Sequence, residues 1–200
     1  LDFAEKMKLN IAVDNTLDKL CRSKFLINLE TKENPGFYTF IHDLLRETLI
    51  ATITAVSKRQ YHNYIGRWLE KNEHQNNNEL LAYHFYNAEN FNKAVEYLII
   101  SAQNAETGFS NKRAIEYYSQ LIELLERRYK HFPKKIKLDL INYFSKRGLL
   151  FRLLGEYDKA LSDFFKILDW SKKINDVKNI ILANNHIGSV YRWRGNQTKA

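Results

Sequence analysis

The feature that most constrains this chain is an internal match at an offset of 40 residues, seen between positions 148 and 188. The segments ending at Ala160 and at Ala200 align without a gap. Four pairs carry the match: Gly148 and Gly188, Phe151 and Tyr191, Gly155 and Gly195, and Ala160 and Ala200. A fixed period of this length predicts structural units that stack on their neighbours and bury a continuous core.

The residue types at the matched positions predict a pair of packed helices in each unit. The first glycine, at 148 and 188, lets the second helix lie close because no side chain intervenes. The aromatic residue at 151 and 191 fills the space between the helices. The second glycine, at 155 and 195, ends the first helix in a left-handed conformation. The alanine at 160 and 200 is small where the two helices cross.

One stretch of this pattern resembles a known family. It reads Gly155-Glu156-Tyr157-Asp158-Lys159-Ala160-Leu161 and is similar to the most typical part of the tetratricopeptide repeat. A fainter copy runs from Glu89 to Val95. The resemblance implies an all-α region over residues 79–200, in which tetratricopeptide-like helix pairs form a right-handed superhelix that is truncated at the C-terminus.

A superhelix of this kind has a concave groove lined by the first helix of each pair, and the groove commonly receives a peptide or another helix. The residues that we expect to line it are Tyr143, Lys146, Arg147, Asn185, Ser189 and Arg192. Their mixture of amides and cations predicts a protein or peptide partner that is acidic or extended. The alternative is a solvent-facing polar surface without a ligand.

The first 71 residues predict a separate small unit. Asp14 is placed to cap a helix that ends near Ser23. Apolar residues at period two, turn residues and a second aromatic run predict a β-hairpin over residues 25–40. Two helices follow, the second starting near Ser57. This order predicts a winged-helix-like unit over residues 1–71, joined to the repeats by a polar linker at 72–78.

Two runs in this unit carry a second family resemblance. They extend from Tyr38 to Ile50 and from Lys58 to Glu70, and the first contains the pattern aromatic-x-His-x-Leu-Leu-x-Glu. They resemble the winged-helix segment that closes the nucleotide-binding module of signal-transduction ATPases with numerous domains. That family occurs in large bacterial regulators, beside adenylate cyclases, protein kinases, histidine kinases and transcriptional activators. The resemblance implies a regulatory segment of such a protein.

The run Ile41-His42-Asp43 is similar to the Met-His-Asp motif of that family, whose His contacts the ADP phosphate of the resting state. By this resemblance, His42 is a nucleotide-state sensor in the parent protein and Asp43 orients its imidazole. The alternative is a His that caps a strand–helix junction by bonding the backbone. The chain has no Gly-x-x-x-x-Gly-Lys-Ser/Thr loop, so we expect no cofactor here and ATP or ADP only in the parent.

Composition limits the other classes of function. The single cysteine, Cys21, allows no disulfide framework, and none of the 6 His has a partner at His-x-x-x-His spacing, so we expect no metal site. The chain has no run of about 20 apolar residues, which predicts no membrane and a cytoplasmic location. Without a nucleophile, metal or phosphate-loop pattern, we expect no catalytic residues and no enzyme activity in this chain.

Three functions remain as hypotheses. The chain opens without Met and stops inside a helical pattern, so we expect a larger parent, and we favour a partner-binding regulatory segment of a signalling ATPase. A stand-alone tetratricopeptide scaffold is the second hypothesis. A DNA-binding segment of a transcriptional regulator is the third, because the formal charge is +8. Much of that charge lies at Arg127, Arg128, Lys130, Lys134, Lys135 and Lys137.

Overall fold

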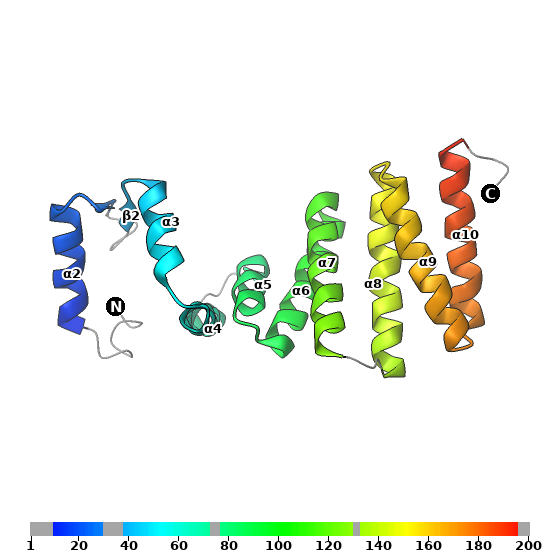
Figure 1. Cartoon of the computed structure of the whole chain (residues 1–200), viewed down its shortest axis with the longest axis horizontal. Coiled ribbons are helices and arrows are strands. Elements are labelled where there is room, and N and C mark those ends of the chain that lie inside the picture. The colour runs from blue at the N-terminus through cyan, green and yellow to red at the C-terminus, as the bar shows by residue number, and fades with distance from the viewer. Residues whose placement is uncertain (1–9, 30–37, 73–76, 130–132, 196–200) are drawn as a thin grey trace. The chain divides into compact units, whose positions relative to one another are not determined.

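The computed structural model describes residues 10–29, 38–72, 77–129 and 133–195. These residues form nine helices and one two-stranded antiparallel sheet (Figure 1). The fold is therefore mostly helical with a small hairpin, as the sequence predicts.

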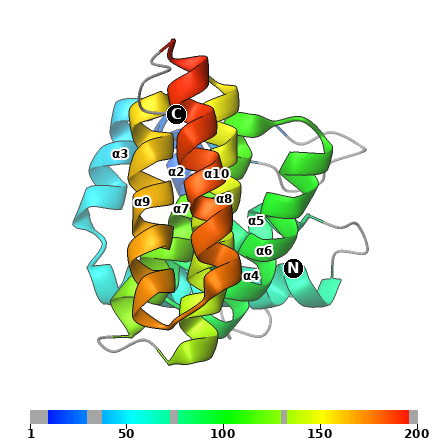
Figure 2. The ribbon, with the colours of Figure 1, turned by 90° about the vertical axis from the view of Figure 1, so that its right-hand side faces the viewer.

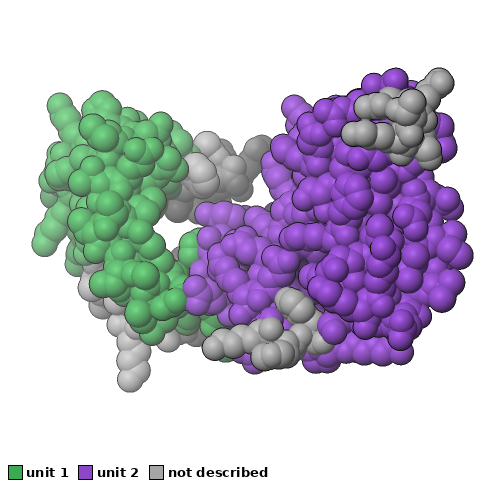
Figure 3. Space-filling model, turned by 45° about the vertical axis from the view of Figure 1, so that its right-hand side comes forward, with its two compact units in different colours: residues 1–72 green, residues 73–200 purple. Residues whose placement is uncertain are grey.

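The chain divides into two compact units, residues 1–72 and residues 73–200 (Figure 3). The division falls close to the boundary expected from the sequence. Both ends of the expected linker belong to helices, because Asn72 completes the last helix of the first unit and Asn78 begins the first helix of the second.

The described part of the first unit contains three helices and two paired strands. They are α2 (Asn10–Arg22), β1 (Leu26–Asn28), β2 (Tyr38–Phe40), α3 (Asp43–Thr52) and α4 (Ala55–Asn72). The strands pair with Leu26 opposite Phe40, so the hairpin is confirmed, although its turn lies outside the described residues. The cap expected at Asp14 is wrong. The helix begins at Asn10, because no helix-breaking residue separates Asn10 from Asp14.

The first unit buries little of its apolar surface. Among residues 15–29 and 38–72, whose burial the structure describes, only Leu26, Gly66 and Leu69 are buried, and α3 has no buried residue. The side chain of Leu44 on α3 is 74% exposed. Large apolar side chains of α3, among them Leu44, are therefore exposed in this part of the chain.

Over residues 77–129 and 133–195, the second unit consists of six helices. They are α5 (Asn78–Asn87), α6 (Phe91–Thr107), α7 (Asn111–Arg128), α8 (Lys134–Leu153), α9 (Tyr157–Lys173) and α10 (Val177–Trp193). Each helix packs on the next along the chain, and α8 also contacts α10. Figure 2 shows α8, α9 and α10 lying side by side. Phe144 and Phe164 are fully buried in the core between these helices.

One backbone geometry recurs at the turns of this unit. A residue with positive φ follows the helix at Glu89, Phe109, Gly155, Asn175 and Gly195. These turns are 20 residues apart from 89 to 109, from 155 to 175 and from 175 to 195. Two helices with their turns therefore account for the 40-residue period of the sequence, while the connection from α7 to α8 is longer.

Most repeat-defining residues of the first copy lie in or against the core between α8 and α9, and Gly155 lies in the exposed turn that joins these helices. Gly148 is buried, and a Cβ atom on it would lie 2.7 Å from Cε1 of Phe164. Phe151 and Ala160 belong to the same buried cluster, and Tyr157 packs against it. Gly155 has a φ of 77°, which a side chain disfavours.

The second copy shows the same arrangement as far as the structure describes it. On α10, Gly188 is buried and Tyr191 packs against the core. Gly195 has the same φ of 77° as Gly155. Ala200, the last matched residue, lies outside the described residues.

Candidate functional site

Three of the six expected groove residues share one face of α10. Asn185, Ser189 and Arg192 are spaced by four and three residues, which places them one above another on a helix. From α8, the Arg152 guanidinium donates a 2.7 Å hydrogen bond through Nη1 to the Ser189 hydroxyl. Arg152 was not among the residues expected in the groove, yet it joins the surfaces of α8 and α10.

A large apolar residue follows each of these arginines in the sequence. Leu153, next to Arg152, is 69% exposed, and Trp193, next to Arg192, is 72% exposed. Within the described part of the chain, neither arginine forms an ion pair with a carboxylate. The surface made of Arg152, Leu153, Asn185, Ser189, Arg192 and Trp193 is called the α8–α10 face below.

The other three expected groove residues point toward different neighbours. Lys146 donates hydrogen bonds of 2.7 Å to Glu106 on α6 and 3.1 Å to the Tyr118 hydroxyl on α7. The Tyr143 ring stacks on Tyr118 with 6.1 Å between centroids. The structure thus divides the six residues into two sets instead of bringing them together, because α8 uses one side for α7 and another for α10.

Arg147 is occupied by contacts inside the protein. Its Nε and Nη2 atoms donate to the two carboxylate oxygens of Asp163 at 2.9 and 2.7 Å, and Nη1 donates to the Ser119 hydroxyl at 3.0 Å. Its guanidinium lies 5.3 Å from the centroid of Phe144. Burial raises the pKa of Asp163, and the hydrogen bonds from Arg147 oppose that rise. This pair and the bond to Ser119 hold the Arg147 side chain between α7, α8 and α9.

His42 stands at the N-terminus of α3 in the first unit. Its backbone is extended, its carbonyl oxygen accepts from the backbone amide of Leu45 at 3.1 Å, and its side chain makes no capping hydrogen bond. The Asp43 carboxylate lies 3.7 Å from the Arg46 guanidinium. The described contacts therefore link Asp43 with Arg46, and the exposed imidazole of His42 faces an adjoining cleft.

Metal-binding clusters and membrane-spanning helices are both absent from the described residues. These residues hold no group of three or more His, Cys, Asp or Glu placed to bind a metal ion. None of their helices is long and apolar enough to cross a membrane. Comparison with known proteins gives no family model, no curated protein and no solved structure that matches this chain.

Proposed function

We propose that this chain is a non-catalytic, partner-binding segment whose second unit is a tetratricopeptide-like superhelix. Its α8–α10 face binds an acidic peptide. One observation carries the proposal: Arg152 and Arg192 have no carboxylate partner in the described residues, and they lie beside the exposed Leu153 and Trp193. The matched turns and buried small residues of the two repeat copies support the superhelix.

The chemistry of this face suits such a partner. A guanidinium forms paired, charge-assisted hydrogen bonds with a carboxylate, and Asn185 can bond the main chain of an extended peptide. Trp and Arg are the residue types that most often dominate binding energy at protein interfaces. The formal charge of +8 favours approach by an acidic partner.

Selection from a random peptide library tests this proposal. We expect enrichment of peptides rich in Asp and Glu, which Arg152→Gln and Arg192→Gln each bind about tenfold more weakly because a charged hydrogen bond is lost. Arg127→Gln is the matched control, because Arg127 lies on α7 and is paired with Glu123. Selection without acidic enrichment, or equal loss in the control, would contradict the proposal. Strong salt-dependent binding to DNA would instead favour the DNA-binding alternative.

We propose that the parent protein is a larger signalling ATPase that uses ATP or ADP, in which partner binding to the second unit is relayed to an NTPase and an output domain. The resemblance of the first unit supports this, and so does the His42 imidazole, which no backbone capping bond engages. The parent gene should then encode a phosphate loop upstream. ADP should leave the His42→Ala parent faster, and an unchanged rate of release would count against His42 as the sensor.

A further inference from the structure

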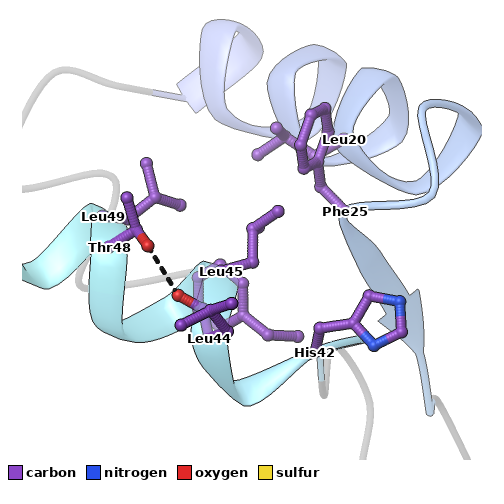
Figure 4. A pocket seen from close by; sticks show the side chains of 8 residues that line it. Leu20, Phe25, His42, Leu44, Leu45, Thr48 and Leu49 are labelled. Atoms are coloured by element: carbon purple, nitrogen blue, oxygen red, sulfur yellow. Dashed lines mark hydrogen bonds between the residues drawn. The ribbon is translucent and has the colours of Figure 1, made fainter.

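The first unit contains an open cleft of about 740 Å³ beside His42. Its lining residues are Leu20, Phe25, Phe40, His42, Leu44, Leu45, Thr48 and Leu49. Figure 4 shows Leu20 of α2 and Phe25 before β1 on one side, with Leu45 of α3 pointing toward them from the other. The cleft therefore has two facing walls, and its volume lies in the range of small-molecule sites, about 300–1,000 Å³.

Among the described residues that line this cleft, two have polar side chains. Thr48 donates its hydroxyl to the Leu44 carbonyl oxygen at 2.7 Å, so its donor is already satisfied. His42 lies at the edge of the cleft, where β2 leads into α3 (Figure 4), and its side chain is exposed. The cleft thus combines an apolar body with a single hydrogen-bond donor at its edge.

The apolar walls expose enough surface for a ligand that covers them to gain binding free energy. Leu44 is 74% exposed, Leu49 is 46% exposed and Phe25 is 41% exposed. Covering apolar surface gains about 25 cal/mol per Å², so a ligand that removes these side chains from water binds favourably. An alkyl chain can follow the two walls, because it brings no polar group that would need a partner there.

We propose that this cleft binds an alkyl carboxylate. The alkyl chain lies between the leucines of α3 and the Leu20–Phe25 wall, and a carboxylate oxygen accepts a hydrogen bond from the His42 imidazole. A carboxylate fits better than a phosphate ester, because no Lys or Arg is among the described lining residues to balance a second charge. The inference is independent of the α8–α10 face.

Calorimetric titration of the whole chain with decanoate tests the site. We expect saturable binding of one decanoate per chain. Leu45→Trp fills the cleft while keeping its apolar character, so binding should fall by about tenfold or more. Leu138→Trp, at an exposed position of α8 outside both proposed sites, is the matched control and should bind as the wild type does. Circular dichroism checks that the helices persist, and Leu49→Trp replaces Leu45→Trp if the latter unfolds.

A second comparison tests the head group. His42→Ala should weaken binding of decanoate about tenfold and leave 1-decanol within about twofold, because only the carboxylate depends on a charge-assisted bond. The proposal fails if decanoate does not bind, or if it binds the filled cleft as tightly as the wild type. Self-association of the chain through this cleft, without decanoate binding, would also overturn it. Equal losses for decanoate and 1-decanol in His42→Ala would remove His42 from the site.

Discussion

At the scale of single residues, the contact between Gly148 and Phe164 shows how one small residue sets the distance between two helices. The Phe164 ring is fully buried and occupies the space that a side chain at position 148 would need. Because the surrounding core is closely packed, the ring has no free volume into which to move. This glycine is therefore explained by a close approach between helices and not by its backbone conformation.

Gly148→Leu should destabilise the second unit by roughly 1–3 kcal/mol through overpacking, with a lower melting temperature. Ala160→Trp should do the same, since Ala160 is fully buried in the same cluster. The control is Asn142→Leu, which adds a leucine at an exposed position of α8. If all three variants had the same melting temperature as the wild type, the close packing of α8 on α9 would be refuted.

His186 gives the second unit a dependence on pH. Its ring stacks on Phe164 with 4.9 Å between centroids, and burial lowers its pKa below 6.5, helped by the nearby Arg152 guanidinium. A lowered pKa in the folded state means that the unfolded state takes up the proton first as pH falls. The stability that neutral His186 contributes is therefore present above about pH 6.5 and is lost at lower pH.

We expect the melting temperature of the chain to fall between pH 7.5 and pH 5.5, and to fall less in His186→Gln. Burial also lowers the pKa of His62 in the first unit, so His62→Gln separates the contribution of that unit. If the melting temperature depended on pH in the same way in the wild type and in His186→Gln, folding would not lower the pKa of His186.

At the scale of elements, the turn between α6 and α7 places a bulky aromatic residue in the left-handed position that recurs at the turns of this unit. Gly108 has a φ of −83°, and the next residue, Phe109, has the positive φ of 56°. The sequence indicates Gly108 as the end of α6, and α6 does end beside it, but the left-handed position falls on a bulky residue. Phe109 is 87% exposed, so packing does not compensate for the strain.

Phe109→Gly should stabilise the second unit by about 0.5–1 kcal/mol, because glycine adopts positive φ without a steric penalty. The control is Phe165→Gly, at a half-exposed position inside α9, where glycine should cost about 1 kcal/mol. Thermal unfolding measures both changes. Destabilisation by Phe109→Gly would mean that the aromatic ring contributes more than the turn geometry costs.

The sequence predicts the helices, strands and turns of this chain better than it predicts the contacts between its polar side chains. Glycine chemistry and apolar periodicity locate the hairpin, the turns at Gly155 and Gly195 and the buried face of α9, since these depend on local conformation. The bond between Arg152 and Ser189 joins residues 37 positions apart, and the pair of Arg147 with Asp163 joins two helices. A single sequence does not show which polar side chains meet across helices, so the expected groove included Arg147 and omitted Arg152.

At the scale of the whole molecule, the two units differ in how much they bury. The second unit has a continuous core of leucines and aromatics, whereas the first leaves Leu44 and Leu49 of α3 exposed. The sequence has a polar stretch after α4 that interrupts the helical pattern, and the division between the two units falls close to it. The sequence does not predict the open cleft, since the periodicity of α3 is the same whether or not another element covers it.

The most direct test of the central claim, that the α8–α10 face binds an acidic peptide, is an amide NMR titration of the whole chain with the tightest peptide from the library selection. The account predicts shift changes that cluster on the last turns of α8, near Arg152 and Leu153, and on α10 from Asn185 to Trp193. These shift changes should be smaller in the Arg192→Gln variant. Changes centred on α7 or on the first unit, with α10 unmoved, would contradict it.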